Sequence, residues 1–170
     1  MATDYEAFYQ KNKQGLGAPT KAFVDFFDVY KKQKARVLDV GCGQGRDALF
    51  IARLGHKVVA LDHAPTGIAD LKELAQKEAL DIEARVSDIK AAQYSGIFDV
   101  VVLDRVLHML NAPDREKVLN RLLEHVSHKS HLLIADEPSN LPAIKKILNA
   151  SVHACDDHQP KPGLLFVRIL

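Results

Sequence analysis

The chain has 170 residues, of which 47% are hydrophobic and 26% charged, and its formal net charge is +1. These values are typical of one soluble globular domain over residues 1–170, and the near-neutral charge makes a nucleic-acid partner unlikely. The N-terminus is acidic, the two cysteines are far apart and no apolar run approaches a membrane span of about 20 residues, so we expect a cytoplasmic protein without a membrane segment or a disulfide framework.

Residues 1–30 predict an N-terminal helical cap. Tyr5 and Tyr9 have helical spacing and form either a lid over a ligand or a plain apolar face. A second aromatic helix is predicted around residues 23–30.

Strand-like and helix-like segments alternate from about Ala18 onward. This alternation is typical of a parallel sheet with helices on both faces. Buried parallel strands are predicted at 36–40, 57–61, 98–103 and 131–135, with a weaker edge strand at 82–86.

Helical patterns separate these strands. They begin near Gly45, run through Ile68, Leu71 and Leu74, and extend from an N-cap at Asn111 to Val126. A short helix is expected around 141–148. The segments 151–155 and 163–170 are joined by a link too short for a crossover helix, which predicts an antiparallel hairpin at one edge of the sheet.

The turn after the first strand contains three glycines, Gly41, Gly43 and Gly45. A dinucleotide site needs a third glycine where Arg46 stands, and the preceding acid, Asp39, would repel a pyrophosphate. The same acid can hold an ammonium group. The turn therefore favours S-adenosylmethionine, which carries an ammonium and a sulfonium and has no phosphate.

Two further acids follow later strands. Asp62 ends the second strand, where a carboxylate can bind ribose hydroxyls, and Asp88 ends the third, beside the apolar Ile89. Each acid alone can equally cap the following helix or turn. Three acids at successive strand ends together indicate one nucleoside-like ligand.

These segments together resemble the class I S-adenosylmethionine-dependent methyltransferases. The resemblance rests on VLDVGCGQGRD at 37–47, VVALD at 58–62, SDI at 87–89 and FDVVVLDRVLH at 98–108. Within that class, GCGQGRD with Gly55-His56 is most similar to small-molecule enzymes of the tellurite-resistance and thiopurine type. The resemblance implies a Rossmann-like seven-stranded, mostly parallel sheet with an antiparallel C-terminal strand hairpin.

The resemblance also implies roles for the matched positions. The cofactor S-adenosylmethionine, and its product S-adenosylhomocysteine, would contact the ends of four strands. The expected cofactor residues are Asp39, Gly41, Cys42, Gly43, Gly45, Asp62, His63, Asp88, Ile89, Leu103 and Asp104, with Cys42 as a small packed residue rather than a nucleophile.

Arg105 and His108 are the candidate catalytic residues, because they lie one helical turn apart after the fourth strand. Arg105 would hold an anionic acceptor and His108 would take a proton. Alternatively, Arg105 pairs with a neighbouring acid and His108 packs as a partly buried polar residue. The run from His153 to His158 contains zinc-type ligands but no second cluster at a known spacing, so no metal site is predicted.

The sequence thus predicts methyl transfer to a small-molecule acceptor by a monomer or weak homodimer. Two alternatives stay open: a cofactor-binding partner subunit without activity, and a minimal RNA or protein methyltransferase.

Overall fold

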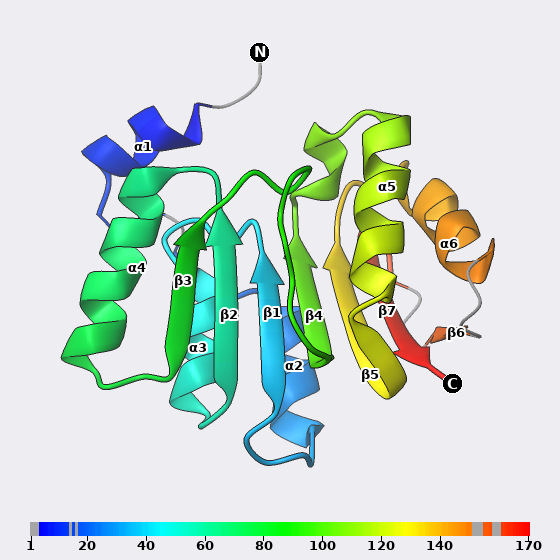
Figure 1. Cartoon of the computed structure of the whole chain (residues 1–170), viewed down its shortest axis with the longest axis horizontal. Helices are drawn as coiled ribbons and strands as arrows, with labels where there is room; N and C mark the ends of the chain where they lie inside the picture. Colours follow the sequence, from blue (N-terminus) through cyan, green and yellow to red (C-terminus); the bar gives the residue numbers. More distant parts are fainter. Residues whose placement is uncertain (1–3, 14, 16, 151–154, 158–160) are drawn as a thin grey trace.

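The computed structural model describes residues 4–13, 15, 17–150, 155–157 and 161–170. One sheet runs through the molecule in the strand order β3-β2-β1-β4-β5-β7-β6 (Figure 1). The strands are β1 (Arg36–Val40), β2 (Lys57–Asp62), β3 (Ile82–Val86), β4 (Phe98–Asp104), β5 (Val126–Ala135), β6 (Cys155–Asp157) and β7 (Leu164–Ile169). The helices are α1 (Tyr5–Lys11), α2 (Lys21–Val29), α3 (Arg46–Arg53), α4 (Pro65–Lys77), the 3-10 helix η1 (Leu107–Met109), α5 (Ala112–Leu123) and α6 (Leu141–Ala150).

The first five strands pair in parallel, and β7 pairs antiparallel with both β5 and β6. The mostly parallel sheet and its C-terminal antiparallel hairpin are therefore confirmed. Strand β6 has only three residues, which extend a sheet of six longer strands. It begins at Cys155, at the end of the predicted 151–155 strand, whose other residues lie outside the described part of the chain.

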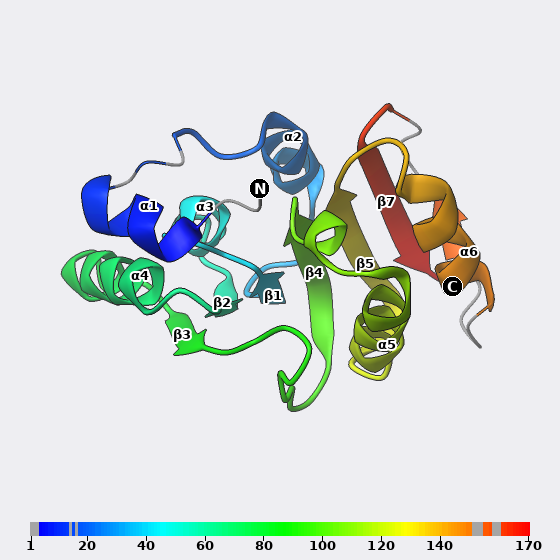
Figure 2. The ribbon, with the colours of Figure 1, turned by 90° about the horizontal axis from the view of Figure 1, so that it is seen from above.

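Helices cover both faces of the sheet (Figure 2). Buried side chains of α2, α3 and α4 pack on one face, and those of α5 and α6 pack on the other. Each buried leucine or phenylalanine contributes about 1.5–3 kcal/mol, so these two apolar layers supply the main driving force for folding.

The predicted start of helix α5 is confirmed, but its predicted end is wrong. Asn111 is the N-cap of α5, and its side chain accepts a hydrogen bond from the Asp114 N–H at 2.8 Å. The extension of this helix to Val126 is wrong: α5 ends at Leu123, and Val126 begins β5, where it pairs with Phe98. Leucine and valine suit both a buried helix face and a buried strand, so periodicity could not place this boundary.

The strand order reverses between β1 and β4. Strands β2 and β3 lie on one side of β1, whereas β4 and β5 lie on its other side. The loops that leave β1 and β4 therefore diverge and create a crevice at the carboxyl ends of the strands. Helix α1 lies at this end of the sheet (Figures 1 and 2).

Within the described residues, no helix combines the length and the apolar character that a bilayer crossing requires.

Gly45 should tolerate no side chain. Its φ is +83°, and an added Cβ would collide with the Leu71 side chain on α4. Gly55 has a similar φ of +87° with open space around it. We expect Gly45→Ala to lower the free energy of unfolding by about 2–5 kcal/mol, from backbone strain and overpacking, and Gly55→Ala by about 1–2 kcal/mol, from strain alone. Urea denaturation measures the free energy of unfolding of both variants. Equal losses would show that the collision with Leu71 adds no cost beyond the backbone strain.

Candidate functional site

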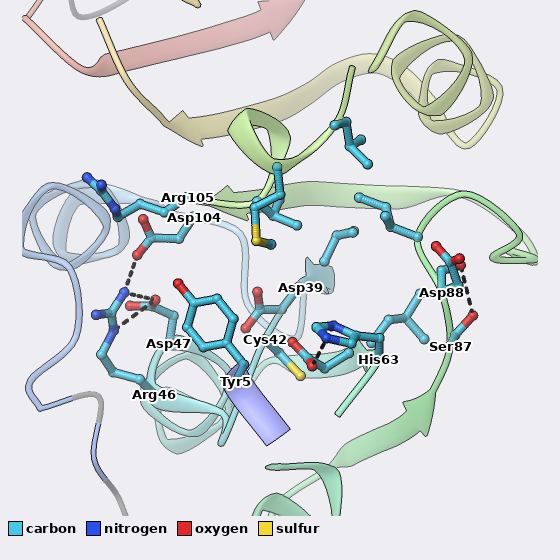
Figure 3. Close-up of a pocket in the computed structure, with 18 of the residues that line it drawn as sticks. Tyr5, Asp39, Cys42, Arg46, Asp47, His63, Ser87, Asp88, Asp104 and Arg105 are labelled. Atoms are coloured by element: carbon cyan, nitrogen blue, oxygen red, sulfur yellow. Dashed lines mark hydrogen bonds and ion pairs between the residues drawn. The ribbon is translucent and has the colours of Figure 1, made fainter. Parts of the chain in front are cut away.

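A cavity of about 430 Å³ lies at the carboxyl ends of β1 to β4, under α1 (Figure 3). Most of the residues predicted for the site line it: Tyr5, Tyr9, Asp39, Gly41, Cys42, Asp62, His63, Asp88, Ile89, Asp104 and Arg105. Four strand ends and the N-terminal helix thus bring together residues that are up to 100 positions apart in the chain.

Four predicted residues do not line the cavity. Gly43 and Gly45 shape the loop behind it, and Gly45 is the N-cap of α3. Leu103 is 1% exposed and packs in the apolar core. His108 belongs to η1 and also lies outside the lining.

Asp39 is a buried acid, and one of its carboxylate oxygens accepts no hydrogen bond. Its side chain is 3% exposed, lines the cavity and has an oxygen, Oδ2, without a hydrogen-bond partner. Burial raises the pKa of Asp39 well above its ordinary value, and the nearby carboxylates of Asp47 and Asp104 raise the pKa further. A cation entering the cavity would relieve both penalties.

Asp62 fastens the glycine-rich loop to the end of β2. One carboxylate oxygen accepts the Gly43 N–H at 2.9 Å, and the other accepts the Ala64 N–H at 2.8 Å. A carboxylate offers about four acceptor positions, so Asp62 retains capacity for hydroxyl donors in the cavity. His63, with its side chain 59% exposed, lies at the rim, with its Nδ1 3.5 Å from Asp62 Oδ1.

Asp88 and Ile89 form the rim beyond β3. Asp88 is exposed, and its Oδ1 accepts the Lys90 N–H at 2.8 Å, which closes a turn. The half-buried Ile89 adds apolar surface beside it. This pairing of an acid and an aliphatic side chain suits a flat heterocycle with an exocyclic amino group.

The loop after β4 lies opposite the glycine-rich loop. Val106 packs so closely on Gly41 that a Cβ there would lie 2.7 Å from Val106 Cγ2. Met109 and Leu110 continue this apolar wall. Sequence reasoning missed all three residues, because nothing in their spacing separates a pocket wall from a core helix.

The structure separates Arg105 from His108, so the expectation that both face one pocket is corrected. Arg105 is exposed at the cavity margin with a positive φ of 53°, a conformation that costs about 1–2 kcal/mol for a residue with a Cβ. The backbone N–H of His108 donates to Asp136 Oδ2 at 3.0 Å, and its buried ring Nδ1 lies 3.8 Å from the same oxygen without forming a hydrogen bond. The 3-10 turn of η1 breaks the helical spacing that the sequence suggested.

Arg46 and Asp47 are site residues that the sequence analysis did not assign. Arg46 forms ion pairs with Asp47, at 3.0 Å, and with Asp104. Thr20 joins this network, because its hydroxyl donates to Asp104 Oδ2 at 2.6 Å and its N–H donates to Asp47 Oδ1 at 2.9 Å. Burial raises the pKa of Asp104 despite the Thr20 hydroxyl and Arg46, which favour the carboxylate.

Among the described residues of the predicted N-terminal cap, only those of α1 line the cavity. Helix α1 supplies Tyr5 and the buried Tyr9 to the lining. Helix α2 instead packs into the core through Phe23 and Phe27, because its aromatic face has the whole sheet to bury against. Burial raises the pKa of the Tyr9 hydroxyl.

Two further expectations concern the thiol of Cys42 and the run from His153 to His158. Burial raises the pKa of the Cys42 thiol well above its ordinary value, which disfavours a reactive thiolate. No group of three potential metal ligands occurs in the described ranges, and His153 and His158 lie outside them.

The cavity presents acids at the ends of β3, β2 and β1, and at the end of β4 it presents Asp104 together with an apolar wall. The strand order β3-β2-β1-β4 sets these groups in a row. Such a row can hold an elongated ligand that carries a heterocycle at one end, hydroxyls in the middle and a cation beside the apolar wall.

Comparison with known proteins agrees with this geometry. A family model described as "Tellurite resistance protein TehB" matches residues 2–142. A Haemophilus influenzae protein named "Probable S-adenosyl-L-methionine-dependent methyltransferase TehB" is 35% identical over 113 residues, which are 63% of this chain and 40% of that protein. The chain therefore spans less than half the length of this relative.

Solved structures show the same fold. The crystal structure of TehB from Haemophilus influenzae superposes with a TM-score of 0.69 at 23% identity, over 97% of this chain and 65% of that one. A TehB-like methyltransferase from Corynebacterium glutamicum gives 0.72 at 20% identity, over 96% of both chains. The family model covers more than four fifths of the sequence, and the chain accordingly belongs to the tellurite resistance protein TehB family.

Proposed function

We propose that this chain binds S-adenosylmethionine and transfers its methyl group to a small-molecule acceptor. The observation that carries the proposal is the buried, unpartnered carboxylate oxygen of Asp39, which lines the cavity beside the glycine-rich loop. An ammonium group of the cofactor would give this oxygen its partner.

The order of the strand ends supports one orientation of the cofactor. The adenine would lie against Ile89 with its amino group toward Asp88, the ribose hydroxyls toward Asp62, and the methionine ammonium toward Asp39. The methyl group would then point to the loop after β4, where Val106 and its neighbours form the wall.

When bound, S-adenosylmethionine supplies an activated methyl group on a sulfonium. Transfer of this methyl group to an acceptor would leave S-adenosylhomocysteine as the product. The residues of this chain would orient the acceptor in line with the methyl group, and α1 would exclude water from the cavity.

Arg105 supports an anionic acceptor. It is a cation at the cavity margin, next to the apolar wall of Val106, Met109 and Leu110. His108 does not line the cavity, and its ring Nδ1 lies 3.8 Å from Asp136 Oδ2, so we propose acceptors that need no proton removal by this histidine, such as thiolates and metalloid oxyanions.

Binding should strengthen as the pH rises, because burial and the nearby carboxylates raise the pKa of Asp39 in the free protein and an ammonium group pairs with the ionised carboxylate. Asp39→Asn should weaken binding by about 2–4 kcal/mol and remove this pH dependence. Calorimetry of S-adenosylmethionine binding between about pH 5 and about pH 8, in buffers of different ionisation enthalpy, measures affinity and proton release together. A wild-type affinity that does not change with pH would contradict the assignment of Asp39.

Asp62 and Asp88 should differ in their effects on stability. Asp62→Ala should weaken cofactor binding by about 1–3 kcal/mol and also lower the free energy of unfolding, because two buried N–H groups lose their acceptor. Asp88→Ala should weaken binding similarly, with a change in unfolding free energy of about 0.5 kcal/mol, because Asp88 is exposed. Calorimetry and urea denaturation separate the two effects. Unchanged binding in a folded Asp62→Ala protein would remove Asp62 from the site.

Mass spectrometry of pooled thiol, amine, phenol and metalloid acceptors, incubated with the protein and S-adenosylmethionine, tests the activity directly. For an anionic acceptor found in this way, Arg105→Gln should raise KM about tenfold or more without changing cofactor affinity. His108→Gln is the matched control on the same loop and should leave KM within about twofold. Cofactor binding without product from any pool, RNA and peptides included, would favour a non-catalytic partner subunit.

A further inference from the structure

The cofactor loop has a second face, which the proposed chemistry does not use. Gln44 stands between Gly43 and Gly45, is 4% exposed and does not line the cavity. Its amide instead points to the N-terminal residues that follow α1.

Every polar atom of the Gln44 amide is engaged. The Gly15 N–H donates to Gln44 Oε1 at 2.9 Å. Gln44 Nε2 donates to the Asn12 carbonyl oxygen and to Asp70 Oδ2, both at 2.8 Å. Asn12 is the C-cap of α1 and Asp70 lies on α4, so one side chain joins the cofactor loop to both helices.

The other end of α1 is fastened to α4 as well. Glu6 accepts the Thr66 N–H at 3.0 Å and the Thr66 hydroxyl at 2.5 Å. Between the two attachments, Tyr9 packs over Gly67, where an added Cβ would lie 3.0 Å from Tyr9 Cδ2. A helix of seven residues is too short to be stable alone, so α1 depends on these contacts for its place over the cavity.

We propose that Gln44 is a positioning residue that couples the cofactor loop to α1, so that a bound cofactor and a seated α1 stabilise each other. This inference rests on the proposed cofactor binding. A ligand that contacts the glycine-rich loop also restrains the Gln44 amide, and release of the ligand from beneath Tyr5 and Tyr9 requires α1 to leave Gln44 and Thr66. Gln44 touches neither the cavity nor the reacting groups, and therefore acts through α1.

The test compares two substitutions that each remove a side chain linking neighbouring elements. Gln44→Met keeps the length of the side chain and removes its three hydrogen bonds. Arg53→Met is the control, because Arg53 joins α3 to α4 through two 2.7 Å bonds to Glu78 and does not touch α1. Thr66→Val weakens the other attachment of α1 and provides a second variant if Gln44→Met does not fold.

The two readouts are the dissociation rate of S-adenosylhomocysteine in stopped flow and the hydrogen exchange of the α1 amides with and without this ligand. Gln44→Met should release the ligand about tenfold faster, and the ligand should no longer protect α1 from exchange. Thr66→Val should act in the same direction, and Arg53→Met should release the ligand at the wild-type rate.

The outcomes separate this inference from the proposed function. Ligand binding with equal release rates in Gln44→Met, Thr66→Val and wild type, even with a lowered Tm, would assign Gln44 a purely structural role and overturn the coupling. Failure of the unaltered chain to bind S-adenosylhomocysteine would overturn the proposed function and the coupling together.

Discussion

The carboxylate of Asp62 holds together the two elements on which the site depends. It accepts the N–H of Gly43 in the loop after β1 and the N–H of Ala64 at the start of α4. Buried N–H groups must find acceptors, and a carboxylate satisfies them more strongly than a neutral group. The loop can therefore keep its three residues with positive φ, Gly41, Gly43 and Gly45, in one conformation. The cavity floor and the attachment of α1 both follow from that conformation.

The site gathers more acidic than basic side chains in a small, partly buried volume. Arg46 offsets part of this charge by pairing with Asp47 and Asp104, and the Thr20 hydroxyl shares Asp104. Asp39 receives no such partner at its Oδ2. Burial of an unpaired carboxylate is costly, which explains why such a group is retained mainly where a cationic ligand can pair with it.

The loop on the other side of the cavity is held by different means. The loop after β4 has no regular strand or helix beyond the single turn η1, and two buried charges fix its backbone. Asp136 accepts the His108 N–H, and the 8% exposed Arg115 donates to the carbonyl oxygens of Leu107 and Leu110. These contacts leave the side chains of Val106, Met109 and Leu110 free to form the pocket wall. The contacts that fix the backbone of this loop are therefore separate from the side chains that form the wall.

The sequence by itself determined the parts of this protein that depend on local patterns. Apolar runs such as 98–103 identified the buried strands, and Gly41, Gly43 and Gly45 identified the turn, because only glycine adopts such backbone conformations without strain. The acids at strand ends followed from the topology that those strands imply.

Only the tertiary structure decided which side chains meet across distant segments. The 3-10 turn η1 separates Arg105 from His108 despite their helical spacing in the sequence, and the roles of Arg46 and Gln44 depend on Thr20, Asp70 and α1, which no sequence spacing relates. Local residue types constrain backbone conformation, whereas the direction of a polar side chain is set by the partners that folding brings to it.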